Sequence, residues 1–453
     1  MGLSSLREDW LEPIRKLSFG TDGVRGVANR GLLPEDALRL GLAAARRFGG
    51  TVVIGRDTRL SGGMLACALA AGVASGGGRA LDLGVLPTPG AAALAARLGA
   101  SAAGVVSASH NPYPDNGIKF LSGEGRKLPE EAERELERLA LDPFPERPVA
   151  GGVGRVEALE DAPEMYAGAV LGALRPEVPG LRVLLDCANG AACAIAPRVF
   201  RELGVRLTVV GDAPDGTNIN EGCGSTHIER LEVAGHDVAF AFDGDADRVL
   251  ALDERGRVVD GDRIIAILAR DLKERGRLGG GAVVTVMSNL GLLKALESLG
   301  IPCEVTPVGD RHVAEAMLRV GASVGGEQSG HVIVAEHATT GDGIVTALAL
   351  LDVMARTGRS LSELAGVMEV YPQVLVNVRV ERDGGAGRVA ASGTVERAVE
   401  DARRELGERG RIVLRPSGTE PVVRVMVEHE DEEVCRRVCE RVAGVVSREG
   451  GGG

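Results

Sequence analysis

Three aspartates stand two residues apart in the segment DGDADR, as Asp243, Asp245 and Asp247. They follow the apolar run VAFAF, and in an extended backbone the three carboxylates face the same way. Adjacent anions repel one another unless a cation joins them, and hard carboxylate oxygens suit Mg²⁺, which keeps positions open for water or phosphate oxygens. An EF-hand calcium loop is a rival, with Glu254 at the twelfth position, but Arg248 replaces the glycine of the sixth. The spacing favours an enzyme metal site, with a solvated acidic turn as the simplest alternative.

A serine follows another apolar strand in the segment SASHNP, where Ser109 is flanked by His110, Asn111 and the strand-breaking Pro112. We expect Ser109 to be exposed and open to phosphorylation, although a plain polar turn is an equal alternative. Lys119, one of only five lysines, follows in DNGIKF. Its ammonium could stabilise phosphoryl charge, or accept a proton if burial lowers its pKa.

The segment GEQSGH brings four hydrogen-bonding side chains together between glycines: Glu327, Gln328, Ser329 and His331. Such a set suits the hydroxyls of a sugar, although similar loops also form ordinary turns.

The segment RPSGTEP contains the parts of an anion-binding site. Arg415 could contact a phosphate with two N–H groups, Ser417 and Thr419 offer hydroxyls, and Gly418 lets its backbone N–H approach closely. Arg424 on the next strand could add a second guanidinium. A polar hairpin turn is the alternative. The sequence contains no GxxxxGK[ST] motif, which excludes a P-loop nucleotide enzyme as the source of phosphate.

Composition limits the class of protein. A net charge of −12 argues against nucleic acid as a partner, so a small anionic substrate would need a local basic pocket. No basic-then-apolar leader and no apolar run long enough to span a bilayer is present, so we expect a cytoplasmic protein without a membrane partner. The seven cysteines fit reduced thiols, and Cys435 and Cys439 fit core packing better than zinc binding.

The elements that must position these loops occur as a repeat of strand, helix, strand, helix and strand. The three copies run from about residue 51 to 112, 181 to 248 and 282 to 331. This βαβαβ pattern predicts mostly parallel sheets, and in such sheets ligands lie beyond the carboxyl ends of the strands. Each copy therefore offers one motif loop to a shared site. After about residue 368 the pattern changes to that of a smaller α+β domain.

We therefore predict an α/β fold of three related α/β domains and a smaller C-terminal α+β domain. The expected boundaries are 1–153 for the serine-bearing domain, 154–253 for the metal-binding domain, 254–367 for the sugar-binding domain and 368–453 for the phosphate-binding domain.

Five motifs in this order, FGTDGVRG (19–26), SASHNP, DGDADR, GEQSGH and RPSGTEP, resemble the α-D-phosphohexomutase superfamily over essentially the whole chain. CANGAA, NINEGCGSTH, VGDRHV and TTGDGI resemble its phosphoglucosamine mutase branch. Gln328 stands where the related phosphomannomutase/phosphoglucomutases typically have methionine, and Ala246 where many relatives have glycine.

The resemblance implies that the four domains surround a central cleft, that Ser109 is the phosphoserine, and that Asp243, Asp245 and Asp247 bind Mg²⁺ with its phosphate. It also implies that Glu327 and Ser329 take sugar hydroxyls and that RPSGTEP holds the nonreacting phosphate of a small phosphosugar. The positions that match residues near the transferring group are Arg25, Lys119, Arg248 and His331.

The implied reaction interconverts glucosamine 6-phosphate and glucosamine 1-phosphate through a 1,6-bisphosphate. Mannose or glucose phosphates are the alternative substrates, and a noncatalytic phosphosugar-binding protein is the alternative class. The sequence leaves open the oligomeric state, the first source of the phosphate and whether Lys119, Arg25 or His331 moves the proton.

Overall fold

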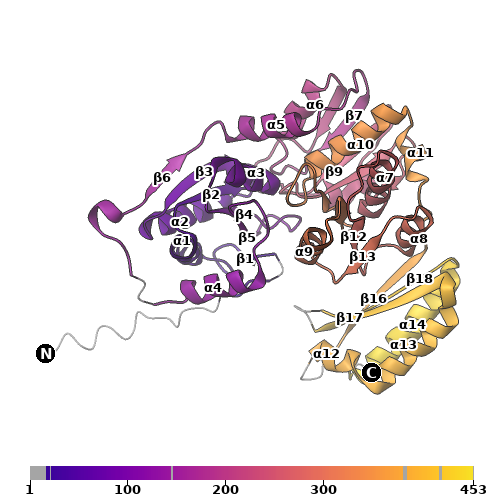
Figure 1. Cartoon of the computed structure of the whole chain (residues 1–453). Coiled ribbons are helices and arrows are strands. Elements are labelled where there is room, and N and C mark those ends of the chain that lie inside the picture. The colour runs from indigo at the N-terminus through magenta and orange to yellow at the C-terminus, as the bar shows by residue number, and fades with distance from the viewer. Residues whose placement is uncertain (1–16, 21, 144–145, 381–384, 418–420, 452–453) are drawn as a thin grey trace.

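The computed structural model describes residues 17–20, 22–143, 146–380, 385–417 and 421–451. Four sheets with their helices follow one another along the chain, and we call them the first to fourth units (Figure 1). Within the described residues no helix is long and apolar enough to cross a membrane.

The first unit contains the predicted repeat in full. Its elements are β2 (Thr51–Arg56), α2 (Gly62–Ser75), β3 (Arg79–Val85), α3 (Thr88–Leu98) and β4 (Ala102–Val106). Strand β2 pairs in parallel with both β3 and β4. The sheet is extended by antiparallel strands β5 (Asp115–Ser122) and β1 (Val24–Val27), and its helices include α1 (Pro34–Phe48) and α4 (Glu130–Ala140).

Strand β6 (Arg155–Ala158) corrects one predicted boundary. It pairs in parallel with β3 and so completes the first sheet, although a boundary at 153/154 would assign it to the second unit. The sequence of β6 alone does not say which sheet edge it joins, because an edge strand takes its partner from tertiary structure.

The second unit departs from the predicted repeat. Its sheet has the order β11-β10-β9-β7-β8, built from β7 (Arg182–Asp186), β8 (Arg206–Val210), β9 (Val238–Phe242), β10 (Val249–Asp253) and β11 (Val258–Val259). Helix α6 (Ala196–Glu202) connects β7 to β8, but only the 3-10 helix η2 (Ser225–Arg230) lies between β8 and β9. The second helix is missing because residues 211–227 are rich in Gly, Asp and Asn, which favour turns. Strand β11 also lies beyond the predicted boundary at 253.

The third unit follows the prediction closely. Strand β12 (Ala282–Thr285) pairs in parallel with β13 (Cys303–Thr306) and β14 (Val324–Gly326), while β15 (Val332–Val334) is antiparallel. Its helices are α7 (Gly261–Glu274), α8 (Leu290–Ser298), α9 (Asp310–Val320), α10 (Gly343–Thr357) and α11 (Leu361–Ala365).

The fourth unit is the predicted α+β domain. Strand β18 (Val422–His429) lies between β16 (Gln373–Arg379) and β17 (Gly410–Pro416), and both pairings are antiparallel. Its helices are α12 (Gly385–Ala390), α13 (Gly393–Leu406) and α14 (Glu432–Glu449). Cys435 and Cys439 of α14 are fully buried and contact backbone carbonyls, which fits the expected core packing.

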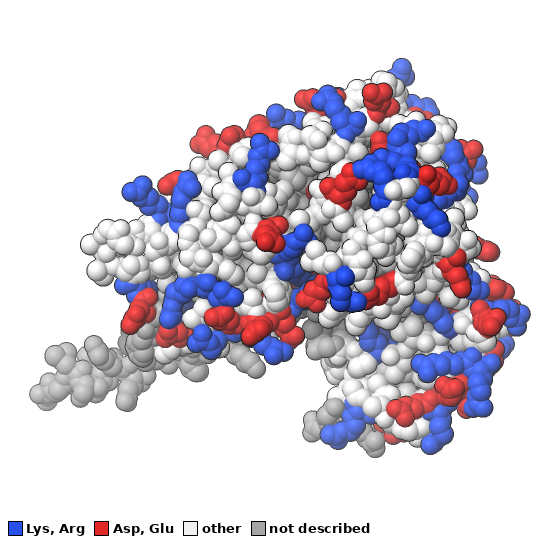
Figure 2. All heavy atoms as spheres, in the orientation of Figure 1, with Lys and Arg blue, Asp and Glu red and all other residues white. Residues whose placement is uncertain are grey.

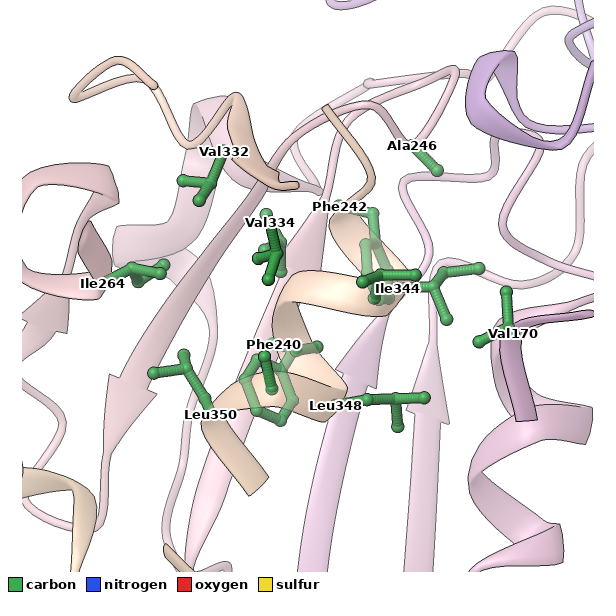
Figure 3. Close-up of a cluster of buried hydrophobic side chains, with 14 of the residues drawn as sticks. Val170, Phe240, Phe242, Ala246, Ile264, Val332, Val334, Ile344, Leu348 and Leu350 are labelled. Atoms are coloured by element: carbon green, nitrogen blue, oxygen red, sulfur yellow. The ribbon is translucent and has the colours of Figure 1, made fainter. Parts of the chain in front are cut away.

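One apolar core runs through the first three units, whereas the fourth unit has a core of its own. Figure 3 shows Ile344 and Leu348 of α10 beside Phe240 and Phe242 of β9, so a helix of the third unit packs on the sheet of the second. On the face shown in Figure 2, acidic and basic side chains are interspersed, and the outline is notched between the first and fourth units.

Candidate active site

Ser109 lies in the loop between β4 and β5 and is 1% exposed, which corrects the expectation of an exposed serine. It is covered because the DGDADR loop of the second unit lies directly against it. The Ser109 hydroxyl donates a hydrogen bond of 2.5 Å to Asp243 Oδ2. Ser109 also has a φ of +50°, in the left-handed region that L-residues rarely adopt.

The three aspartates of DGDADR converge, although the segment forms a turn rather than the extended backbone expected, and one carboxylate oxygen of each lies within 4.8 Å of the others. All three residues are buried, and Asp245 Oδ1 and Asp247 Oδ1 have no hydrogen-bond partner. Burial and the charges of Asp247 and Asp245 raise the pKa of Asp243 well above its usual value. Buried anions with unpaired oxygens fit a divalent cation.

The rest of the loop fits a metal site better than an EF-hand. The Glu254 carboxylate accepts hydrogen bonds from the hydroxyl and backbone N–H of Ser362, and β10 follows the loop immediately. Ala246 has a φ of +56°, so the glycine of many relatives would adopt this turn with less strain.

Lys119 of β5 extends across the unit boundary to the aspartates. Its Nζ lies 2.7 Å from Asp245 Oδ2 and 3.4 Å from Asp247 Oδ2. Burial lowers the pKa of Lys119, but Asp245, Asp247 and Asp22 more than offset this and raise it above its usual value. In this arrangement Lys119 is ion-paired with two of the three aspartates.

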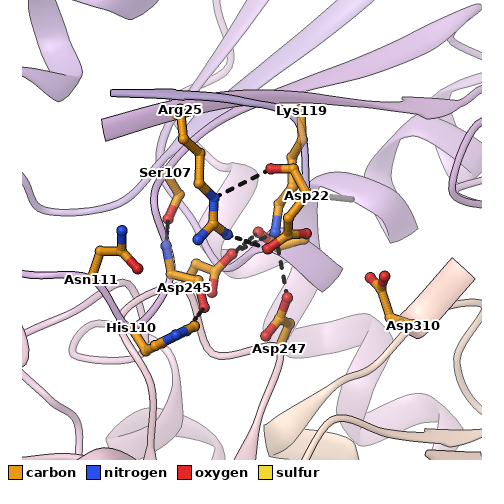
Figure 4. A network of polar contacts seen from close by, with 12 residues as sticks. Asp22, Arg25, Ser107, His110, Asn111, Lys119, Asp245, Asp247 and Asp310 are labelled. Carbon is orange, nitrogen blue, oxygen red and sulfur yellow. Dashed lines mark hydrogen bonds and ion pairs between the residues drawn. The ribbon is translucent and has the colours of Figure 1, made fainter. Parts of the chain in front are cut away.

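A second charged network joins the first unit to the third, and Figure 4 shows three of its residues, Arg25, Asp22 and Asp310. Arg25 forms an ion pair with Asp22, whose Oδ1 lies 3.2 Å from Lys127 Nζ. Lys127 also forms an ion pair with Asp310, whose Oδ2 lies 3.9 Å from His331 Nε2. The structure thus brings Arg25 and His331 into one network. The sequence reasoning missed Lys127 and Asp310, although Lys127 is one of five lysines and Asp310 lies in VGDRHV.

Two further side chains lie around the serine. His110 Nδ1 is 3.3 Å from Ser109 Oγ, and burial with the charges of Arg248 and Arg25 lowers the pKa of His110 to about 4. Its imidazole is therefore neutral at pH 7. Arg248 donates its backbone N–H to Asp243 Oδ1 at 3.1 Å, and its guanidinium Nε lies 3.8 Å from Asp247 Oδ1.

The GEQSGH loop joins β14 to β15. Glu327 Oε1 accepts the backbone N–H of Gly309 at 3.1 Å, and Gln328 Nε2 donates to Asp260 Oδ2 at 3.3 Å. Ser329 is exposed and His331 is buried. The loop therefore presents polar groups beside the Asp310 network.

The segment RPSGTEP, in which we expect an anion site, begins in β17 and ends just before β18. Arg415 and Arg424 are direct partners across these strands, and the Ser417 N–H donates to the Val422 carbonyl at 2.8 Å. Burial and the charge of Arg424 lower the pKa of Arg415, while Glu327 of the third unit raises it. Two neighbouring guanidiniums near the GEQSGH loop fit an anion. Gly418 and Thr419 lie outside the described residues.

The sequence reasoning also missed the residues behind the serine loop. Asp57 and Arg59 follow β2, and Asn220 comes from the second unit. Both Arg59 and Asn220 donate hydrogen bonds to the Ser109 carbonyl. The available signal was the position of Asp57 and Arg59 just after the carboxyl end of a parallel strand, where ligand-binding loops occur.

Comparison with known proteins identifies the class first. The models of phosphoglucomutase/phosphomannomutase match in order: α/β/α domain I at residues 16–143, α/β/α domain II at 169–256, α/β/α domain III at 260–371 and the C-terminal domain at 375–445. A phosphoglucomutase/phosphomannomutase family protein from Burkholderia thailandensis has a TM-score of 0.81 at 25% identity, over 94% of this chain and 96% of that one. Fold and site thus define a phosphohexomutase.

Relatives with similar sequences show which family of phosphohexomutases the chain resembles. The phosphoglucosamine mutase of Rubrobacter xylanophilus is 97% identical over 97% of this chain and 99% of its own length. That of Moorella thermoacetica is 53% identical, over 95% of this chain and 99% of its own. The chain belongs to the phosphoglucosamine mutase family.

Proposed function

We propose that this enzyme interconverts glucosamine 6-phosphate and glucosamine 1-phosphate through a phosphoserine at Ser109, in the cytoplasm, feeding the synthesis of UDP-N-acetylglucosamine and cell wall. The observation that carries the proposal is the contact between Ser109 Oγ and Asp243 within the three-aspartate cluster. Membership of the phosphoglucosamine mutase family supports glucosamine phosphate as the substrate.

Asp243, Asp245 and Asp247 would hold Mg²⁺ together with the phosphate on Ser109. The bound ion supplies positive charge that offsets the aspartates and the transferring phosphoryl group. The unpaired oxygens of Asp245 and Asp247 support this assignment. A solved fungal structure, that of Aspergillus fumigatus N-acetylphosphoglucosamine mutase, is described as a complex with GlcNAc-6P and magnesium; at 19% identity and a TM-score of 0.72 over 97% of each chain, it compares in fold alone.

The first transfer breaks the bond between phosphorus and Ser109 Oγ and forms one to the free C1 oxygen of glucosamine 6-phosphate. The sugar hydroxyl loses its proton, and Ser109 Oγ ends as a hydroxyl, the form whose hydrogen bond to Asp243 is seen here. Lys119, which contacts Asp245, and Arg248, which lies beside Asp247, would stabilise the charge that develops between donor and acceptor. The product of this step is the 1,6-bisphosphate.

The bisphosphate must then turn over, so that its 6-phosphate returns to Ser109. One site must therefore bind either phosphate while the other reacts. Arg415, Ser417 and Arg424 would form it with Gly418 and Thr419, while Glu327, Gln328 and Ser329 orient the sugar. The separate core of the fourth unit supports a domain that opens for this reorientation and closes to exclude water.

Two measurements test the proposal. Intact mass and phosphorus NMR should show one phosphate on Ser109 after incubation with a hexose 1,6-bisphosphate. The primed enzyme with Mg²⁺ should then give its highest kcat/KM with glucosamine 6-phosphate rather than mannose or glucose 6-phosphate. A preference for either of the other sugar phosphates would refute glucosamine 6-phosphate as the substrate. An unphosphorylated Ser109 would refute the phosphoserine mechanism.

A further inference from the structure

The serine loop is held from behind by a buried arginine. The Arg59 side chain is 0% exposed, and its guanidinium donates to four backbone carbonyls of one loop. Nη2 donates to the carbonyls of Ser109 and Asn111, both at 2.8 Å, and Nη1 donates to those of Pro112 at 2.5 Å and Asp115 at 3.0 Å. One side chain thus fixes the path of the loop from the serine to the start of β5.

Asp57 holds Arg59 and links it to the serine by a second route. Its Oδ2 accepts from Arg59 Nε at 2.9 Å and from the Ser107 hydroxyl at 2.6 Å. The Ser107 oxygen in turn accepts the backbone N–H of Ser109 at 2.9 Å. Because the guanidinium is paired with a buried carboxylate, Arg59 acts on the loop through geometry rather than through net charge.

The second unit also donates hydrogen bonds to two of these carbonyls. Asn220 Nδ2 donates to the carbonyl of Ser109 at 2.9 Å and to that of Asn111 at 3.1 Å. The Asn220 backbone N–H donates to the Ala188 carbonyl, which anchors it in the second unit. Gly244, inside DGDADR, lies so close that a Cβ there would stand 2.5 Å from the Ser109 carbonyl oxygen. The carbonyl of Ser109 is therefore fixed from both units.

These contacts hold Ser109 in a strained backbone conformation. A non-glycine residue with a φ of +50° is strained and persists only where its surroundings determine it. This conformation directs Oγ at Asp243. If the backbone relaxed into the ordinary region, Oγ would swing away from the aspartates.

We propose that Arg59 and Asn220 are positioning residues for phosphoryl transfer: they hold the Ser109 carbonyl so that Oγ stays aimed at the aspartate cluster. The inference rests on the proposed function. Arg59 sets the loop within the first unit, and Asn220 ties it to the unit that carries the aspartates. Asn220 thereby fixes the position of Ser109, in the first unit, relative to the aspartates of the second unit.

Asn220→Asp is the most informative variant, because it keeps the shape of the side chain but replaces the donating amide with an oxygen that repels the two carbonyls. Arg59→Lys keeps the charge but offers fewer donors in a different geometry. Asn116→Asp is the matched control, since Asn116 is a buried asparagine of the first unit whose amide bonds Ser61 rather than the Ser109 carbonyl.

The readouts separate positioning from folding. They are kcat and KM with glucosamine 6-phosphate, the rate at which a hexose 1,6-bisphosphate phosphorylates Ser109, and the phosphorus NMR shift of the phosphoserine, each per folded molecule by circular dichroism. We expect N220D to lower kcat and the phosphorylation rate about 100-fold, because a displacement of about 1 Å can cost that much. We expect KM to change less than about threefold and the phosphoserine shift to move. R59K should show a smaller loss of the same kind.

A folded N220D with the wild-type kcat and phosphoserine shift would overturn the inference, as would an equal loss in N116D. If R59K does not fold, the kinetics of N220D and Asn220→Ala test the positioning role without it. A wild-type enzyme that is phosphorylated but does not turn over glucosamine 6-phosphate would refute the proposed sugar, while the phosphorylation rates would still decide the positioning role. A wild-type Ser109 that takes no phosphate overturns both.

Discussion

The junction between the first and second units differs from the junction between the third and fourth. At the first junction Ser109 and Lys119 bond to Asp243 and Asp245 inside a core that continues through both units. At the second junction the fourth unit keeps its own core, and polar contacts join it to the third unit. The molecule thus places the reacting groups on a continuous platform and the expected phosphate site on a separable domain.

The contacts of the second junction are specific. Asn289 and Tyr371 exchange two hydrogen bonds of 3.0 Å, and Glu428 of β18 accepts the Leu290 N–H at 3.2 Å. Arg411 of β17 pairs with Glu428 and donates to the Ser288 carbonyl. Polar contacts of this kind can be broken and remade at low cost compared with a shared apolar core. Changes at the first junction should therefore affect the chemistry, and changes at the second should affect substrate capture.

The largest effect is expected from Ser109→Ala. Without Oγ the enzyme has no atom to carry the phosphate, and we expect kcat to fall by more than about 10⁴-fold. A coupled assay with primed enzyme measures the loss, and intact mass should show no added phosphate. Ser362→Ala is the control, because the Ser362 hydroxyl bonds Glu254 rather than the cluster. Full activity in S109A would refute the phosphoserine.

Metal removal should affect the first junction almost as strongly. The three buried carboxylates repel one another without a cation, so a chelator should abolish turnover and lower the melting temperature, and Mg²⁺ should restore both. Differential scanning fluorimetry and the activity assay check this. Asp243→Asn should lose the stabilisation by Mg²⁺. An unchanged melting temperature with and without Mg²⁺ in the wild type would contradict the assigned site.

A change at the second junction should be milder and of another kind. Arg411→Ala removes the ion pair with Glu428 and the bond to the Ser288 carbonyl. We expect KM for the phosphosugar to rise about three- to tenfold, because the loss of one or two partly buried polar contacts costs roughly 1 kcal/mol. Steady-state kinetics decide, with Arg437→Ala, which removes a surface pair with Glu405, as control. A fall in kcat with KM unchanged would show that this junction serves the chemistry instead.

The sequence predicted the parts of the structure that depend on local patterns. Apolar strands alternating with helices predicted three of the four sheets, and carboxylates two residues apart predicted the converging aspartates. It could not predict which sheet β6 joins, because edge pairing is decided by tertiary contacts. It assigned no role to Arg59 or Asn220, although Asn220 lies in NINEGCGSTH, because their partners are backbone carbonyls contributed by distant parts of the chain. The predicted exposure of Ser109 was wrong because the DGDADR loop that covers it comes from another unit.

The smallest effect on turnover is expected from Asp262→Asn on α7, beside the second junction. Burial and the charge of Asp260 raise the pKa of Asp262 to about 7, while the Asn289 N–H, bonded to its Oδ2 at 2.7 Å, lowers it. The pKa in the unfolded chain is about 3.9, so between about pH 4 and pH 7 the folded state binds more protons. The contribution of Asp262 to stability is therefore greatest at low pH and falls by at most about 1.4 kcal/mol per pH unit as pH rises through this window.

Asparagine does not titrate, so D262N should gain stability relative to the wild type from pH 5 to pH 8. Melting temperatures of both proteins across this range measure the difference, with Asp352→Asn, an aspartate paired with Arg356 on α10, as control. Parallel pH profiles would show that Asp262 is already ionised at pH 5. A difference that grows with pH, with kcat unchanged, would show that the second junction contains a titrating group that the chemistry at Ser109 does not use.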